Sequence, residues 1–316
     1  MRGIFAELVQ QKGEIKVNAP HIPVLLNEVK EIFVDIDDGY IIDCTVGYGG
    51  HSEALLEQNK NIKLICCDQD EEAIAFSKKR LERFKDRIIF ENAKFSTVIK
   101  KYIDLPIKGI LADIGVSSLQ LDKSSRGFGF DSEVLDMRMN PKNQKSAKDV
   151  VNSYSQKELE EIFFEYGEIR DSKRVAKAIM DNRPFESSRE LASVLKKLGG
   201  KPKIHPATLP FQAIRIEVND ELGELNELLE SIYSSKLQNS LVAIISFHSL
   251  EDRIVKKTYK FWTKNCICPA GVMRCECGDN HSLGKIITKK PITATKKEEK
   301  INPRSRSSKM RVFKLR

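Results

Sequence analysis

Short apolar segments alternate with segments of helical periodicity in the first third of the chain. The apolar segments are typical of strands buried on both faces of a sheet, and they span residues 40–44, 63–67, 87–91 and 109–113. Residues 51–58 and 71–84 carry apolar side chains at the spacing of an amphipathic helix. Repeated strand–helix units predict a parallel sheet with helices on both faces.

This alternation stops after Val116. Residues 117–145 have a loop-like composition, and two or three helices follow, with capping-box spacing at Ser155–Glu158 and Ser187–Glu190. A proline-containing connector at 201–210 closes this part of the chain. The sequence thus predicts a helical unit that interrupts the sheet.

The sheet-like pattern returns at Phe211. We expect one long helix to about residue 236, then a buried strand at 240–247, a helix at about 250–262 and a final strand at 309–316. The predicted fold class is therefore α/β with an inserted all-helical domain. The sheet domain would comprise residues 21–116 and 211–316, and the inserted domain residues 117–210.

Charge is concentrated at one end of the chain. The net charge is +8, but residues 284–316 hold twelve Lys or Arg against two Glu. A basic C-terminal tail of this kind favours a polyanionic partner, since neutralised phosphates release counterions; a solvated tail is the alternative. No apolar segment approaches the ~20 residues that cross a bilayer, so we expect a cytoplasmic protein without membrane contact.

The seven cysteines fall into two groups. Cys44, Cys66 and Cys67 lie in predicted strands, where buried reduced thiols are expected. The other four, Cys266, Cys268, Cys275 and Cys277, form a C-x-C-x6-C-x-C cluster. Four thiols can bind zinc tetrahedrally, yet C-x-C is tighter than the usual two-to-four residue gap, so a structural zinc stays open. Catalysis by these thiols is not expected, and we assign no metal to the catalytic site.

A glycine-rich turn follows the first predicted strand, in the pattern D-x-T-x-G-x-G-G from Asp43 to Gly50. A dinucleotide-binding loop would need a third glycine where Ser52 stands, and a phosphate-binding loop would need a lysine that is absent. Asp43 would repel phosphate and suits a cation. S-adenosylmethionine fits, because it carries an ammonium and a sulfonium and no phosphate. Asp68, at the end of the second strand, is placed to accept both ribose hydroxyls, with Asp70 as second candidate.

Six segments together resemble the ribosomal RNA small subunit methyltransferase H family, also called MraW. They are "TVGYGGHS", "LADIGVSSLQLD", "RGFGF…LDMRM", "HPATLPFQAIRIEVNDEL", "IISFHSLEDRIVK" and "NPRSRSSKMR". The resemblance extends from His21 to about Arg311, which leaves residues 1–20 as an N-terminal extension. It implies a class I, Rossmann-like methyltransferase domain with an inserted helical domain for substrate recognition. It also implies methyl transfer from S-adenosylmethionine to the exocyclic N4 of a cytidine in the decoding region of 16S rRNA.

The resemblance also implies which residues contact the cofactor. They are Gly49, Gly50, His51, Asp68, Phe95, Asp113 and Gln120. The sequence departs from the family at Leu119, where members usually have proline, and this affects the backbone that presents Gln120. The implied partner is 16S rRNA within the small ribosomal subunit; a homodimer is left open.

Two residues are candidates for catalysis. The cytosine N4 amine is a poor nucleophile, and a group that accepts one of its protons would help. We predict that Asp113 is this acceptor, assisted by the backbone at 114–115; alternatively it only orients the cofactor. His248 is the second candidate, with contact to the base, contact to a phosphate, or capping of the helix that starts at Ser249 as its alternatives.

Three further segments are candidates for RNA contact, each with a structural alternative. Asp136 and Arg138 suit base and phosphate contact or an internal salt bridge. Phe128 and Phe130 suit a wedge that splays the base from its stack, or the core. Residues 304–308 are expected to bind RNA phosphate.

Two other functions compete with methyl transfer. A nicotinamide-dependent dehydrogenase explains the glycine turn and Asp68 but not Ser52 or the basic segment. A non-catalytic RNA-binding or ribosome assembly factor would keep the fold and lose cofactor binding, which the intact glycines and both acids argue against.

Overall fold

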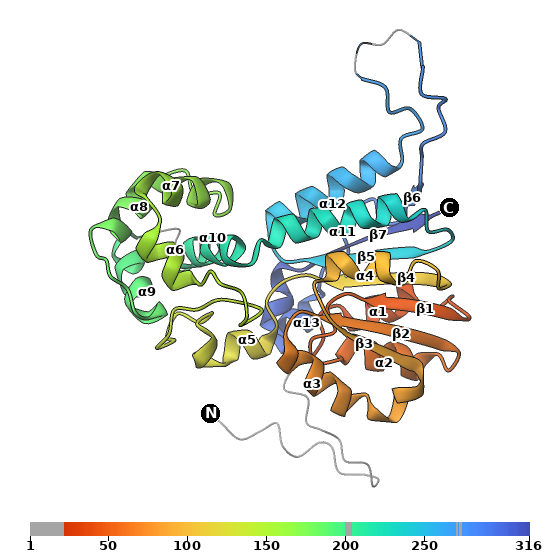
Figure 1. Cartoon of the computed structure of the whole chain (residues 1–316), viewed down its shortest axis with the longest axis horizontal. Helices are drawn as coiled ribbons and strands as arrows, with labels where there is room; N and C mark the ends of the chain where they lie inside the picture. The colour runs from red at the N-terminus through yellow and green to blue at the C-terminus, as the bar shows by residue number, and fades with distance from the viewer. Residues whose placement is uncertain (1–21, 200–203, 270, 272–273) are drawn as a thin grey trace.

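The computed structural model describes residues 22–199, 204–269, 271 and 274–316, so the predicted extension at 1–20 lies outside the described residues. A seven-stranded sheet with strand order β3-β2-β1-β4-β5-β7-β6 lies in one of the two lobes of the molecule (Figure 1). Its strands are β1 (Gly39–Asp43), β2 (Ile62–Asp68), β3 (Ile88–Asn92), β4 (Ile107–Asp113), β5 (Leu241–Ser246), β6 (Gly284–Ile286) and β7 (Lys309–Leu315).

Strands β1 to β5 run parallel, and β7 pairs antiparallel with both β5 and β6. The six strands predicted from apolar segments are all present, with ends that differ by one or two residues. The predicted α/β fold class, with a parallel sheet and helices on both of its faces, is confirmed. In such a sheet the carboxyl ends of the parallel strands share one edge, where ligands bind.

Helices cover both faces of the sheet because side chains alternate along each strand. Ile41 packs into the core beneath α1 (Leu26–Ile32), α2 (Gly50–Gln58) and α3 (Glu71–Arg80). Ile42 packs into the opposite core, beneath α4 (Phe95–Lys101), α11 (Glu221–Ser235) and α12 (Ser249–Trp262). The thiols of Cys44, Cys66 and Cys67 are free and buried in these two cores, as predicted.

Between β4 and α11 the chain forms a helical lobe beside the sheet (Figure 1). It begins with α5 (Ser118–Asp122) and η2 (Ser124–Arg126), followed by α6 (Ala147–Ser153), α7 (Gln156–Glu165), α8 (Ser172–Met180), α9 (Ser188–Lys197) and α10 (Thr208–Asn219). The helices α6 to α10 enclose a hydrophobic core of their own, which includes Phe163, Phe185 and Phe211. Both predicted capping boxes are present, at the starts of α7 and α9.

The predicted helix from 211 to 236 is wrong in one respect, because two helices replace it. Asp220 adopts a left-handed conformation, with φ of 50°, and separates α10 from α11. Helix α10 begins before residue 211 and packs on α6 and α7. The division of the chain into 21–116 with 211–316 and 117–210 stays a proposal.

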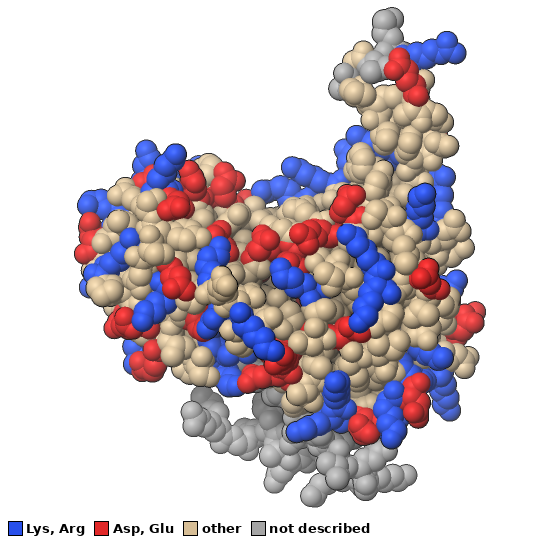
Figure 2. Space-filling model, viewed as in Figure 1, with Lys and Arg blue, Asp and Glu red and all other residues tan. Residues whose placement is uncertain are grey.

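The basic segment 284–316 is not a solvated tail. It forms β6, α13 (Lys296–Ile301), η3 (Pro303–Ser307) and β7, and β7 lies inside the sheet. The alternative of a solvated tail rested on net charge alone. The strand predicted at 309–316 is confirmed as β7, whose apolar side chains, such as Met310 and Val312, are buried. On the face drawn in Figure 2, basic and acidic side chains are interspersed over both lobes.

Candidate cofactor and active site

A cavity opens at the carboxyl ends of β1, β2 and β4, between the sheet and the start of the helical lobe. All of the cofactor residues implied by the sequence line it except Gly49; they are Gly50, His51, Asp68, Phe95, Asp113 and Gln120. These residues are spread over 70 positions of sequence, and the parallel strands bring them together. The cavity is also lined by residues from α10 and α11, so both lobes contribute to its wall.

The glycine turn forms one wall of the cavity. Gly47 has φ of 49°, and a Cβ atom built there would meet only the Thr45 carbonyl oxygen at 3.8 Å, so this backbone is open to a ligand. At Gly50 a Cβ would lie 2.3 Å from Cγ of Pro23, so only glycine lets α2 start this close to that proline. Gly49 caps α2 in a left-handed conformation and does not line the cavity.

Asp43 does not face the cavity, although the sequence pattern suggested a direct role in cation binding. Its carboxylate accepts a hydrogen bond of 2.6 Å from Ser52 Oγ and one of 3.2 Å from the Thr45 N–H, and its side chain is buried. Burial raises the pKa of Asp43 to about 6. Ser52, the residue that breaks the dinucleotide motif, is thus the hydroxyl that holds Asp43.

Asp68 and Asp70 take different roles. The Asp68 carboxylate lines the cavity and accepts hydrogen bonds of 2.9 Å from the N–H groups of Gly47 and Asp70. Desolvation raises its pKa to about 6. Asp70 is buried; it caps α3 through the Glu72 N–H and forms a 2.8 Å ion pair with Arg126. The geometry therefore favours Asp68 for the ribose.

Gln120 holds the loop that follows β4. Its Nε2 donates to Asp70 Oδ2 at 3.0 Å, and its Oε1 accepts from the Ser117 N–H at 3.0 Å. Both polar groups of this side chain are thus engaged within the protein, and a direct contact of Gln120 with the cofactor stays a prediction. Leu119, the departure from the family pattern, lies one residue earlier in α5. Phe95 begins α4 and presents a ring to the cavity, where an aromatic base can pack.

Asp113 is the carboxyl group of the cavity whose pKa is raised most. Its Oδ1 is buried and has no hydrogen-bond partner among the described residues, and its Oδ2 lies 3.8 Å from Nδ1 of His51. Burial, with the nearby charges of Asp43 and Glu251, raises the pKa of Asp113 to about 8. His51 Nε2 lies 2.8 Å from the Val24 carbonyl, which can only accept. In the neutral ring the proton is therefore on Nε2, and Nδ1 faces Asp113 as an acceptor.

His248 caps helix α12, which is the third of its predicted alternatives. Its side chain completes a capping box with Glu251, whose carboxylate accepts the N–H groups of Phe247 and His248. Its Nε2 lies 3.0 Å from Glu251 Oε1 in an ion-pair geometry. Phe247 and Glu251 line the cavity and His248 does not, so a catalytic role for His248 stays a prediction.

The residues predicted for RNA contact are largely used inside the protein. Arg138 forms a bidentate pair with Asp136, at 3.0 and 2.7 Å, which is the internal salt bridge that was one alternative. Phe128 is buried, and Phe130 stacks on His205 at 4.7 Å between ring centroids; both join the core of the helical lobe. The core alternative is confirmed for Phe128, whereas Phe130 is only partly buried, and a wedge role for it stays a prediction.

Within residues 304–308, Ser305 and Ser308 are buried and bond to nearby carbonyl groups. Arg304 lines the cavity and pairs with Asp122 at 2.5 Å. Arg306 is exposed. Phosphate contact by this segment stays a prediction, and in the described structure Arg306 is the cation of the segment that faces solvent.

Sequence reasoning missed several polar residues of the cavity wall, among them Asn219, Glu224 and Glu251. Asn219 binds the backbone at Met137 and Met139, which ties α10 to the lobe's leading loop. Glu224 is buried and accepts a 2.8 Å hydrogen bond from Ser96. Glu251 was the one with a readable signal, because His248 and Glu251 have capping-box spacing. The other two were hidden, since their partners lie at least 80 positions away.

Comparison with known proteins agrees with this geometry. A model of the MraW methylase family matches residues 18–316, which is nearly the whole chain. The chain belongs to the MraW methylase family. The resemblance recognised in the sequence is thereby confirmed, and S-adenosylmethionine is the cofactor.

Curated relatives in the MraW family are similar along their whole length. The chain is 65% identical over 299 residues to "Ribosomal RNA small subunit methyltransferase H" of Aliarcobacter butzleri, covering 95% of this chain and 100% of the relative. It is 56% identical to the protein of the same name from Campylobacter curvus, covering 95% and 99%. A solved rRNA methylase from Streptococcus thermophilus has 9% identity and a TM-score of 0.42, over 93% of this chain and 98% of that one, which is too distant to bear on function. Among the described residues, no helix combines the length and apolar character needed to cross a membrane.

Proposed function

We propose that the protein transfers a methyl group from S-adenosylmethionine to the exocyclic N4 of a cytidine in the decoding region of 16S rRNA, within the small ribosomal subunit. Family membership supports S-adenosylmethionine-dependent methylation of rRNA. The single observation that carries the finer chemistry is the unpartnered carboxyl oxygen of Asp113, buried at the end of β4 in the cavity. A buried acceptor without a partner is costly, and it points to a group that binds there.

The residues of the cavity fit the cofactor. The open backbone at Gly47 leaves room for the methionine part, and Asp68 is fixed by two N–H groups for the ribose. Phe95 offers a ring for the adenine. When bound, S-adenosylmethionine supplies an electrophilic methyl group on a sulfonium. The charge of this ligand suits an acidic cavity.

Asp113 is placed to accept a proton from N4. The ionised form of a carboxyl with a pKa near 8 is a much stronger base than an ordinary aspartate. Near neutral pH part of the population is in this ionised form, which is the form that accepts the N4 proton. His51 Nδ1 lies 3.8 Å from Asp113 Oδ2, beyond hydrogen-bond distance, so direct transfer of that proton to His51 requires the two side chains to move closer. The backbone at 114–115 follows directly, where Gly115 has φ of 138° and leaves this part of the wall without a side chain.

We propose that the helical unit at 117–210 recognises the RNA around the target. A cytidine must leave its stack to reach a cavity of this kind. Asn219 and Glu224 place polar groups in the wall beside the lobe. Arg304, at the cavity, and exposed Arg306 are the cations that we assign to nearby phosphates. A homodimer stays a prediction.

Calorimetric titration of the full chain tests this proposal against its alternatives. S-adenosylmethionine is expected to bind at one site per chain, and NAD is not. Small ribosomal subunits that lack the modification should then accept labelled methyl groups. Binding of NAD instead would favour a dehydrogenase, and binding of neither would favour a non-catalytic assembly factor; both outcomes would contradict the proposal.

A further inference from the structure

The sequence left open whether four clustered cysteines bind zinc. They lie together in a protruding arm, residues 264–281, between α12 and β6. Figure 1 shows this arm extending away from the body of the protein. Backbone hydrogen bonds close its base, from the His281 N–H to the Asn265 carbonyl at 3.0 Å and from the Leu283 N–H to the Trp262 carbonyl at 2.8 Å. Among the described residues from 264 to 280, none is buried. The described part of the arm therefore has no hydrophobic core that would fix its shape.

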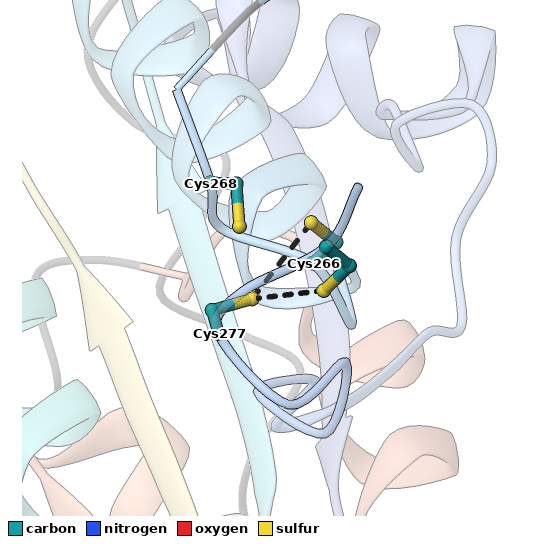
Figure 3. A group of neighbouring side chains, drawn as sticks. Cys266, Cys268 and Cys277 are labelled. Atoms are coloured by element: carbon teal, nitrogen blue, oxygen red, sulfur yellow. Dashed lines mark hydrogen bonds between the residues drawn. The ribbon is translucent and has the colours of Figure 1, made fainter. Parts of the chain in front are cut away.

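The sulfur atoms lie at the spacing of a metal site. All four Sγ atoms are within 4.8 Å of one another, and Cys277 lies 3.6 Å from Cys275 and 3.7 Å from Cys266. Figure 3 shows the side chains of Cys266, Cys268 and Cys277 turned toward one another. A Zn–S bond of ~2.3 Å places two sulfurs of a tetrahedron about 3.8 Å apart. A disulfide would need about 2.05 Å.

The backbone around the thiols supports the same conclusion. The Ile267 N–H, within the first C-x-C pair, donates to Cys277 Sγ at 3.3 Å. The Glu276 N–H, within the second pair, donates to Cys268 Sγ at 3.3 Å. Each pair thus donates a hydrogen bond to a sulfur of the other pair, and such bonds stabilise thiolates, the form that binds metal. His281 directs Nε2 to the Cys277 carbonyl at 2.6 Å, which leaves four sulfurs as the ligands.

We propose that the arm binds one zinc ion through the thiolates of Cys266, Cys268, Cys275 and Cys277. Four sulfur ligands in tetrahedral array select zinc or iron, and a closed set of four thiolates is the arrangement of a structural zinc site. The ion fixes a segment whose described residues are not buried in any core. It takes no part in methyl transfer, because the arm leaves α12 at the end opposite the cavity, and the 14 residues of that helix span ~20 Å.

Metal analysis of the full chain, purified with a reductant and without chelator, tests this site. We expect one zinc per chain, and X-ray absorption should show four sulfur neighbours at about 2.3 Å. Cys275→Ser and Cys268→Ser should each reduce the zinc content at least fivefold. The matched control is Glu276→Gln, which lies between two ligands, alters no thiol and should keep the full content.

A second readout follows the shape of the arm. Removal of zinc by a chelator should make the Arg274 peptide bond cleavable by trypsin at least tenfold faster, while binding of S-adenosylmethionine to the body is unchanged. The proposal is overturned if the arm holds iron, if its thiols are paired as disulfides under reducing conditions, or if the reduced protein takes up no added zinc. None of these results depends on which base the enzyme methylates.

Discussion

Replacement of Asp113 by asparagine should stabilise the free enzyme and inactivate it. The change keeps the shape of the side chain and removes its ionisation. In the folded chain the pKa of Asp113 is raised from 3.8 to about 8, chiefly by burial. The folded state therefore keeps a proton that the unfolded chain has already released above about pH 4. The stability that this proton contributes is lost as the pH rises through 8.

The size of the effect follows from the two pKa values. Between pH 6 and pH 9 the wild type should lose about 2–3 kcal/mol of unfolding free energy through this carboxyl alone, at ~1.4 kcal/mol per pKa unit. The Asp113→Asn variant lacks this loss, so the difference in unfolding free energy between the variant and wild type should increase by the same amount from pH 6 to pH 9. Denaturant unfolding without cofactor, at several pH values, measures the difference.

Asp43→Asn is the matched control. Asp43 also ends a strand and is more fully buried than Asp113, which is about 20% exposed, but its pKa is raised only to about 6. Its contribution should therefore change by less than about 0.5 kcal/mol from pH 6 to pH 9. If the unfolding free energies of wild type and Asp113→Asn change with pH in the same way, the inference that burial raises the pKa of Asp113 is refuted. Methyl transfer by Asp113→Asn should fall by about a hundredfold or more, since a general base is removed.

Two further changes test the cavity wall. Asp68→Ala should weaken S-adenosylmethionine binding at least tenfold in calorimetry, because the ribose loses its acceptor and the glycine turn loses a 2.9 Å hydrogen bond; unchanged affinity would refute the ribose assignment. Gly50→Ala should lower the unfolding free energy by about 1–3 kcal/mol through overpacking, because its Cβ would lie 2.3 Å from Pro23 Cγ. Thermal unfolding measures this loss, and Gly129→Ala, whose Cβ would meet its nearest neighbour at 3.4 Å, is the control. Equal decreases in melting temperature for the two variants would contradict the steric argument.

The sheet and the residues at its carboxyl edge could be predicted because their signals are local. Strands buried on both faces are apolar throughout, and Asp68 and Asp113 are the last residues of two of them. The turn between β1 and α2 could be predicted from its three glycines. The parallel topology then brings these positions to one edge of the sheet. Correct prediction of the strands therefore also predicts most of the cavity residues that lie at the strand ends.

What the sequence could not supply were contacts between distant positions. Asp68 and Asp70 were both candidates for the ribose. The ion pair that engages Asp70 inside the protein is formed with Arg126, 56 positions later in the sequence. The break at Asp220 carries no glycine or proline to mark it. Whether Phe128 and Phe130 are buried depends on how the helical lobe packs, and this cannot be predicted from the periodicity of the sequence.

The most direct test of the central claim is a map of the methyl group. Small ribosomal subunits that lack the modification would be incubated with the protein and isotope-labelled S-adenosylmethionine, and the 16S rRNA would be digested to nucleosides and resolved by chromatography with mass spectrometry. The account predicts one labelled methyl per subunit, on N4 of a single cytidine in the decoding region. Label on C5 of cytosine, on a ribose or on another RNA, or no transfer at all, would contradict it.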